Sequence, residues 1–396
     1  MAQRLTGARR LAAVVLIAAG VAGAAPAVGR AEPEKWHAAV LGGGEFNFVP
    51  QLNNQVTGHG WAGFDSVGKG IVGGGDLHLF YNTTKAHAGV ERIPFADGKL
   101  AFFAFLEGEA VISQLLNDYF QQGRRIREYS IKASYALLHT KLQWYPGKHQ
   151  TIEILAPVRY WWFGDRNSTS PDFTLPANTW VFEPRIGYNF WKIDSPGTEW
   201  ESHRVFPRIT GIAVAIGGGL DVRSDARPWG IPDGRNDPGK VIYSVSQSLR
   251  AGWQLGGFVR LQLDQWGNYG WRQDDITRQR IGGASPYVIP VPGLPWPGLI
   301  SERLFAGQLG VHLKAKESSP HEFGLLVAGG AFNDVYRVGA LNTYSGAGGL
   351  TAFGDLRFGP SGRYQVNIRG SLGFPTAWLE GPPYVALLAA LGVRIF

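Results

Sequence analysis

The chain has 396 residues, of which 44% are hydrophobic and only 17% are charged, whereas an ordinary soluble protein has about 25% charged residues. It has no cysteine, which excludes a disulfide framework and any cysteine-ligated metal site. The formal net charge of +7 falls to +3 without the four arginines of residues 1–31, so the charge does not point to nucleic acid as a partner.

Residues 1–31 have the pattern of a secretory signal. Arg4, Arg9 and Arg10 precede an apolar segment at 11–22, and small residues follow at 25–27 and 29–31. The alternative is a membrane anchor, for which the apolar segment is too short. No later stretch has about 18 uninterrupted apolar residues, so the sequence predicts no spanning helix.

Strand-like alternation begins directly after this segment. The strands expected before residue 209 span 36–49, 71–81, 86–93, 99–111, 126–136, 150–163 and 180–193. Residues 111–120 fit either a short helix or a bent strand. Aromatic residues gather at 160–163 and 180–191 beside polar loops, which favours a girdle at a membrane interface. An aromatic cluster in a protein core is the alternative.

The clearest pattern lies at 241–263, where apolar and polar residues alternate with a period of two. The turn Gly256-Gly257-Phe258 divides it into two strands of a hairpin, each long enough to cross a bilayer when tilted. The polar set includes Arg250, Arg260 and Asp264, which suits a wet or hydrogen-bonded interior, and the apolar set suits lipid. The alternative is a soluble sandwich with one solvent face.

Further strands are expected on both sides of this hairpin, with long loops between some of them. They span 209–223, 305–315, 322–332, 346–358, 364–374 and 384–396. Residues 227–240 form a Pro/Gly/Asp-rich loop, and the Pro- and Gly-rich segment 281–297 cannot be a central strand. Short turns that alternate with long loops are typical of a bacterial barrel.

The sequence therefore predicts an all-β fold, a transmembrane antiparallel β-barrel of about 16 strands. Residues 32–396 form this single domain after the signal peptide, and the location is the bacterial outer membrane, in contact with its lipid. Arg250, Arg260, Asp264 and Arg369 are the candidates for lumen-facing side chains. Ordinary inward polar residues without a special role are the plainer interpretation of all four.

No motif indicates catalysis, and we expect no cofactor, no metal and no enzymatic activity. The nine histidines, such as His78, lack the i, i+4 partner of a helical zinc site, and neither a Gly-x-Ser-x-Gly elbow nor a phosphate loop occurs. Asp274-Asp275 and the loop from Asp233 to Asp237 offer acids for a surface cation, but solvated loop acids are the simpler interpretation.

The C-terminal half, residues 205–396, resembles the barrel of the BamA-like bacterial surface antigen family. Leu220-Asp221-Val222-Arg223 resembles that family's Asp-x-Arg strand end before a long loop. Arg280-Ile281-Gly282-Gly283-Ala284-Ser285 resembles the start of the loop that folds into the barrel, and three later segments follow in the family's order. The resemblance implies a role in protein assembly or export and makes Arg280, Gly282, Gly283, Tyr287 and Pro290 the inward-loop candidates.

Two features depart from that family. Its Val-Arg-Gly-Phe loop core falls here on Tyr287-Val288-Ile289-Pro290, so the arginine that pairs inside family barrels is missing. The strand pattern also begins too early to leave room for periplasmic repeats before the barrel. Both departures weaken the expectation of assembly activity.

The chain ends on Phe396, which resembles the terminal aromatic signal by which the barrel assembly machinery recognises outer-membrane chains. A buried last strand that happens to end in Phe is the alternative. Three functions stay open: a surface-antigen-type barrel in assembly or export, a porin or substrate-selective channel, and a barrel lipid hydrolase with a Ser/His pair at the rim. The sequence does not fix the oligomeric state.

Overall fold

The computed structural model describes most of the chain after the predicted signal peptide. The described residues are 35–48, 55–68, 71–80, 83–111, 119–121, 124–126, 131–165, 169–193, 210–230, 237–274, 276–281, 299–333, 344–359, 363–374 and 384–394. Within these ranges no helix is long and apolar enough to cross a membrane.

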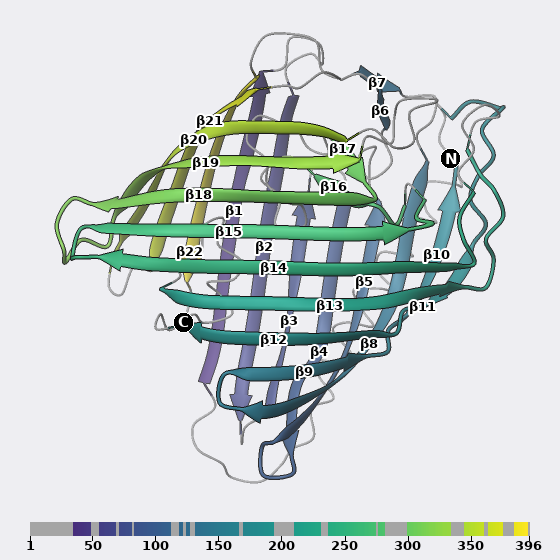
Figure 1. The fold of residues 1–396 in the computed structure, drawn as a ribbon, viewed down its shortest axis with the longest axis horizontal. Coiled ribbons are helices and arrows are strands. Elements are labelled where there is room, and N and C mark those ends of the chain that lie inside the picture. The colour runs from purple at the N-terminus through teal and green to yellow at the C-terminus, as the bar shows by residue number, and fades with distance from the viewer. Residues whose placement is uncertain are drawn as a thin grey trace, which may run out of the picture.

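Eighteen strands form one antiparallel sheet (Figure 1). They are β1 (Lys35–Phe48), β2 (Gln55–Gly68), β3 (Ile71–Phe80), β4 (Thr83–Phe95), β5 (Leu100–Val111), β8 (Lys132–Gly147), β9 (Gln150–Leu155), β10 (Val158–Gly164), β11 (Thr179–Phe182), β12 (Arg185–Ile193), β13 (Gly211–Arg223), β14 (Val241–Leu255), β15 (Val259–Trp271), β18 (Arg303–Lys314), β19 (Glu322–Asn333), β20 (Tyr344–Phe358), β21 (Tyr364–Phe374) and β22 (Tyr384–Arg394). Two small hairpins stand apart: β6 (Tyr119–Gln121) with β7 (Arg124–Ile126), and β16 (Gln279–Ile281) with β17 (Leu299–Ser301).

The sheet closes on itself because β1 pairs with β22. Their register runs from Ala39 opposite Arg394 to Phe48 opposite Val385, which is as many residue pairs as β21 shares with β22. In Figure 1 the near strands β12–β15, β18 and β19 run across the far strands β1–β5 and β8, as strands tilted to a barrel axis do. The fold is therefore a closed antiparallel barrel.

Two spanning strands are interrupted at neighbouring prolines. β9 and β10 pair with the two halves of β8, and Pro157 lies between them. β11 and β12 both pair with β13, and Pro184 lies between them. Proline has no N–H to give to a ladder, so it breaks each strand without changing its course. With each interrupted pair counted once, the 18 strands become 16 spanning strands, which agrees with the predicted number.

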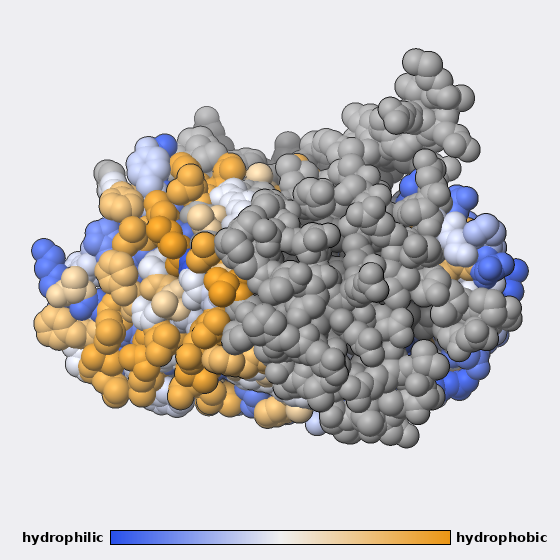
Figure 2. Space-filling view, turned by 90° about the horizontal axis from the view of Figure 1, so that it is seen from above, coloured by the Kyte–Doolittle hydropathy of each residue, from blue (hydrophilic) through white to orange (hydrophobic). Residues whose placement is uncertain are grey.

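The outer wall is apolar across the middle of the barrel. Outward side chains such as Ile186, Ile216, Leu309 and Ile368 are at least half exposed, and Figure 2 shows hydrophobic residues over much of the described wall. Exposed aromatic residues ring both ends: Trp180, Tyr243, Tyr269, Trp271, Phe305 and Phe374 at one, and Phe95, Trp144, Trp253, Phe258, Phe323, Phe358 and Tyr364 at the other. An apolar belt between two aromatic girdles is the exterior of a transmembrane barrel.

The two aromatic segments of the sequence are divided between wall and interior. Tyr160 contacts Trp162 and Trp180, all on the outer face, which is the girdle interpretation. Trp161 and Phe163 alternate with them and face the interior, which is the core interpretation. The girdle interpretation holds for the outward aromatic residues, among them Trp180, Phe182 and Tyr188, and the core interpretation holds for Trp161 and Phe163, because a period of two sends neighbours to opposite faces.

The two rims differ in their connections. One rim has short turns, among them 96–99, 256–258 and 315–321, and Asp97, Gly98 and Gly256 have positive φ there. The turn at 256–258 is the predicted hairpin. The opposite rim, called the mouth here, joins β10 to β11, β13 to β14 and β15 to β18 through long loops. β2 was not predicted, and β8 and β15 extend further than expected, to Gly147 and Trp271.

Candidate functional site at the mouth and in the lumen

Three long loops of the mouth fold together over the inner face of the wall. Trp229, from the loop after β13, is buried against Ile131 and against Phe173 from the loop after β10. The rings of Phe173 and Trp229 meet edge to face with centroids 6.1 Å apart. Phe163, Leu175 and Ile276 pack around this cluster, which we call the apolar cap. The cap covers part of the barrel opening with side chains from segments far apart in the sequence.

Main-chain bonds tie two of these loops together. Thr174 and Gly230 exchange two hydrogen bonds of 2.9 Å, which makes an isolated antiparallel bridge. The Thr179 hydroxyl accepts a 3.1 Å hydrogen bond from the backbone N–H of Asp225, so the loop after β13 is also fixed to β11. The cap is therefore held by backbone contacts as well as by packing.

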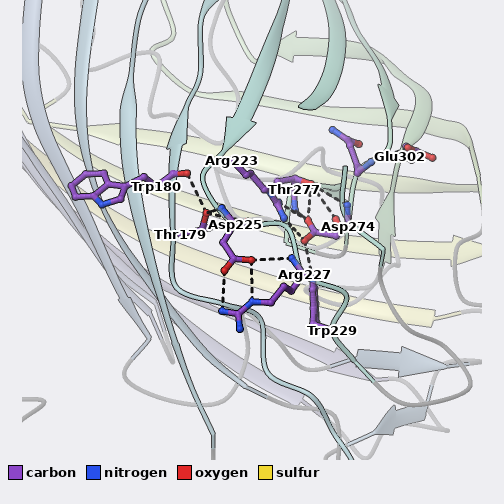
Figure 3. Close-up of polar contacts among 10 residues, drawn as sticks. Thr179, Trp180, Arg223, Asp225, Arg227, Trp229, Asp274, Thr277 and Glu302 are labelled. Atoms are coloured by element: carbon purple, nitrogen blue, oxygen red, sulfur yellow. Dashed lines mark hydrogen bonds and ion pairs between the residues drawn. The ribbon is translucent and has the colours of Figure 1, made fainter. Parts of the chain in front are cut away.

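A buried ion pair anchors the third loop to the inner wall (Figure 3). Arg223, the last residue of β13, donates from Nη1 and Nη2 to the two carboxylate oxygens of Asp274 at 2.7 and 2.8 Å. Trp229 Nε1 donates to Asp274 Oδ2 at 3.0 Å, and the Thr277 hydroxyl donates to Oδ1 at 2.8 Å. These four residues form what we call the mouth latch. It fixes the start of the β15–β18 loop to β13, two strands away.

The mouth latch keeps Asp274 ionised. Burial alone raises the pKa of this carboxyl, but the Arg223 guanidinium and the hydrogen bonds from Arg223, Thr277 and Trp229 outweigh it, so the pKa lies below its usual value. The side chain of Asp274 has no exposed surface and that of Arg223 has 6%. Neither interpretation from the sequence, a surface cation site or a solvated loop acid, holds for Asp274, because its oxygens are buried and bound to donors. No cluster of three acids or histidines that suits a metal occurs in the described part of the chain.

A small pocket lies beside the mouth latch, and the exposed Arg227 is part of its lining. Trp161, Phe163, Thr179 and Trp229 contribute to its lining together with Arg227. Arg227 is paired with Asp225 at 2.9 Å, and its side chain is 75% exposed. Hydrogen bonds from Arg227 hold the pKa of Asp225 below its usual value. The mouth thus has an apolar layer inside and a charged edge outside.

The lumen wall below the mouth carries charged side chains that pair with each other. Arg260 on β15 donates to Glu322 on β19 at 2.7 Å and contacts His312 Nδ1 on β18 at 2.8 Å. Asp264 accepts from Gln262 and Gln308 at 2.9 and 2.8 Å, and Arg250 Nε lies 3.9 Å from it. Such pairing offsets part of the free-energy cost of burying charges along the inner wall.

A second group of charges lies on β10–β13. Arg159 Nε is 2.7 Å from Glu183, and Arg185 donates to Asp221 at 2.7 Å. The Arg159 guanidinium also stacks on Tyr135, 4.4 Å from the ring centroid. Asp221, from the Asp-x-Arg strand end, thus pairs inside the wall, whereas Arg223 of the same motif belongs to the mouth latch.

One strip of the lumen wall has only small side chains. In register, Ala215 faces Ser248, Gly217 faces Ser246, and Gly219 faces Ser244, on the inner faces of β13 and β14. Ser246 is exposed although it points into the barrel at the middle of its strand. Solvent therefore reaches the lumen at this depth. We call this strip the serine strip.

The sequence-predicted candidates are distributed between the described wall and the rest of the chain. Arg250, Arg260, Asp264 and Arg369 lie on the inner face, and the last three are buried. Arg280 lies in β16, opposite Ile300. The other candidates lie outside the described residues: Gly282, Gly283, Tyr287, Pro290 and Phe396. Sequence reasoning missed the pairing of Arg223 with Asp274 and the role of Trp229, because no local pattern links residues 51 positions apart.

Comparison with known proteins agrees with the fold. No protein-family model matches the sequence, and no curated protein matches it either. Among solved structures, BamA from Haemophilus ducreyi lacking POTRA domains 1–3 matches with a TM-score of 0.59 and 9% identity, over 90% of this chain and 70% of that chain. CdiB from Acinetobacter baumannii matches with a TM-score of 0.54 and 10% identity, over 90% of this chain and 60% of that chain. OprD from Pseudomonas aeruginosa gives a TM-score of 0.40 at 9% identity, over 91% and 94%.

The class of protein follows from the closed sheet and its surface. A ring of antiparallel strands with an apolar belt, aromatic girdles and a polar interior is a transmembrane β-barrel of the bacterial outer-membrane type. The similarities to BamA and CdiB support this fold, but at 9% and 10% identity they do not support a particular family or function. The predicted fold class, outer-membrane location and lipid contact are thereby confirmed.

Proposed function

We propose that the protein is an outer-membrane channel without enzymatic activity, which passes small polar solutes through a lumen narrowed at the mouth. The exposure of the inward Ser246 carries this proposal, because it places water beside the wall halfway through the barrel. Pore selectivity depends on diameter, on the hydrogen-bonding groups of the lining and on its charges. The serine strip supplies hydroxyls, and the described ion pairs supply both signs of charge, so we expect weak preference between cations and anions.

Two further observations favour a channel. The seam between β1 and β22 is as fully paired as the neighbouring β21–β22 contact, whereas lateral release of a client requires a weak seam. The described acids near β15, β18 and β19 pair with groups of the wall itself, as Glu322 does with Arg260. A loop arginine inserted at this wall would find Glu322 already paired.

A second candidate function is assembly or export of proteins by a BamA-like surface antigen barrel. The geometry of the β15–β18 loop favours it. This loop starts at the mouth latch and continues as the β16–β17 hairpin. At the end of that hairpin the buried Ser301 hydroxyl lies 2.6 Å from the carbonyl oxygen of Arg303 and 3.2 Å from that of Asn333. The two ends of the loop are thus held by the Arg223–Asp274 pair and by the β16–β17 hairpin. Under this candidate, the loop plugs the lumen until a client protein binds. This candidate is also the function that the resemblance of residues 205–396 to the surface antigen family implies.

Single-channel conductance separates the two candidates. The mature chain is refolded into a planar bilayer beside a variant that lacks residues 282–298 and keeps the β16–β17 base. A steady conductance in the intact protein, raised by the deletion, is the result we expect of a constricted channel. An intact protein that is silent and conducts only after the deletion would favour the plugged assembly barrel. The shift of the folded band on unheated gels controls for insertion of both proteins.

Insertion itself needs a cellular partner. We infer that the barrel assembly machinery recognises the C-terminal strand β22 with Phe396, and that removal of Phe396 lowers the amount of folded barrel in outer-membrane fractions. An unchanged amount would show that the last residue is dispensable for insertion.

A further inference from the structure

Two carboxamide side chains interrupt the apolar outer face in the part of the wall that the structure describes. Gln247 on β14 and Gln265 on β15 share the outward face with Tyr243, Trp253 and Tyr269, and they lie between the two girdles. Gln247 pairs in register with Gly267, two residues from Gln265, so the two carboxamides are diagonal neighbours. They place polar groups at the depth of the hydrocarbon.

Neither carboxamide has a hydrogen-bond partner among the described residues. Gln247 lies flat over Gly267, since a Cβ built on that glycine would meet Gln247 Nε2 and Cγ at 2.9 Å. Hydrocarbon offers no donor or acceptor, so such groups in a membrane belt normally bond to another protein surface. The pair therefore marks a contact site and not a surface made for lipid.

A row of outward glycines crosses the same wall, starting on the strand next to Gln265. Gln265 faces Gly307, Gly307 faces Gly329 and Gly329 faces Gly348, so three outward glycines cross β18, β19 and β20. These strands lie side by side in the near wall of Figure 1. Small residues let two membrane-embedded surfaces approach closely. We call this line the glycine row.

A ridge runs parallel to the glycine row, two residues away along each strand. It consists of side chains that face one another across the strands and project outward: Leu263, Leu309, Val327, Leu350 and Leu372. Leu309 and Val327 are each 51% exposed. On the outer face of these strands, the glycine row is therefore bordered by a parallel ridge of aliphatic side chains.

We propose that this face binds a second copy of the chain. Two copies inserted in the same orientation are related by a twofold axis along the barrel axis, which is the geometry of an isologous interface. Because the strands are tilted, the two glycine rows would cross beside Gln265, and their small residues would let the two walls approach closely there. A primary carboxamide both donates and accepts, so the Gln247 and Gln265 groups of one copy can pair with the same groups of its partner. This proposal rests on the barrel fold and not on the proposed channel function.

Cysteine cross-linking tests the contact, because the native chain has no cysteine. Gln265→Cys is compared with Ile368→Cys, which lies outward at the middle of β21 and away from the Gln247/Gln265 end of the wall. In lipid vesicles at a high lipid-to-protein ratio we expect roughly tenfold more disulfide-linked dimer with Gln265→Cys, because proximity replaces random encounter. Equal yields from both positions would overturn the proposal.

Loss of the carboxamides provides the second test. We expect the wild-type barrel to be dimeric by light scattering in mild detergent, and the Gln247→Leu/Gln265→Leu variant to be monomeric with an unchanged folded-band shift. A wild-type monomer, or a variant that remains dimeric, would contradict the proposal. Co-purification of a different protein that is lost in the variant would also overturn it, because another partner would then cover this face. Conductance of the monomeric variant tests the channel separately.

Discussion

At the scale of single residues, Asp274 is the group on which the mouth depends most. Its carboxylate is buried, and Arg223 is its only charged donor among the hydrogen bonds described above. A buried ion that loses its partner is destabilising by about 3–5 kcal/mol, whereas an exposed pair contributes about 0–1 kcal/mol.

We expect Arg223→Gln to lower the free energy of unfolding by about 3–5 kcal/mol, because Asp274 stays buried without its charge partner. The matched control is Arg227→Gln, which removes an arginine from the exposed pair with Asp225 in the same loop region, with an expected change of about 0–1 kcal/mol. Urea unfolding in lipid vesicles measures both. Equal effects of the two substitutions would mean that the latch does not stabilise the barrel.

The lowered pKa of Asp274 also predicts how this contribution varies with pH. A carboxyl whose folded-state pKa lies below its unfolded value of about 3.9 stabilises the fold above that pH. The contribution is lost as the pH falls through the folded-state pKa. The free energies of unfolding of the wild type and of Asp274→Asn should therefore differ by a constant amount from pH 7 to about pH 5, and this difference should shrink as the pH falls below about 4 towards the folded-state pKa. A difference that vanishes near pH 7 would show that another group titrates in the latch.

At the scale of the elements, paired charges join strands that are not neighbours. Arg260 on β15 reaches Glu322 on β19 across β18, and both side chains are 5% exposed. His312 on β18 contacts the same guanidinium. Together these contacts fix the relative positions of three strands.

We expect Glu322→Gln to lower the free energy of unfolding by about 3–5 kcal/mol, because the buried Arg260 guanidinium loses the carboxylate to which it donates at 2.7 Å. The double variant Arg260→Met/Glu322→Met should recover much of that loss, since apolar residues of similar volume can replace a buried pair. A double-mutant cycle from urea unfolding supplies the coupling energy. Additive effects of the two changes would mean that the pair does not act as a unit.

The elements also show how far the sequence alone can lead. The hairpin at 241–263 was predictable because one face meets lipid and the other the lumen, which imposes a period of two. β2 was missed, since Gly58, Gly60 and Gly63 weaken that period. The breaks in 150–163 and 180–193 follow from Pro157 and Pro184, yet only pairing with β8 and β13 shows that the strands continue beyond them. The mouth latch joins residues that are far apart in the sequence, so no local sequence pattern predicts it.

At the scale of the whole molecule, the two faces of one thin wall meet different solvents. Ile368 lies outward, midway along β21 between Tyr364 and Phe374, and is 53% exposed. Ser246 lies inward, midway along β14, and is also exposed. Both residues are therefore accessible, but we assign Ile368 to hydrocarbon and Ser246 to water.

Arginine placed at each position tests this assignment directly. Ile368→Arg should cost about 2–4 kcal/mol of folding stability, because a charge then enters the bilayer near its midplane. Ser246→Arg should change stability by less than about 1 kcal/mol, because its guanidinium stays in water, and it should lower single-channel conductance by narrowing the pore. Folding into vesicles followed by urea unfolding measures the first quantity, and planar-bilayer recording the second. If Ser246→Arg proved the more destabilising of the two, the lumen would be packed and not wet, and the channel proposal would lose the observation that carries it.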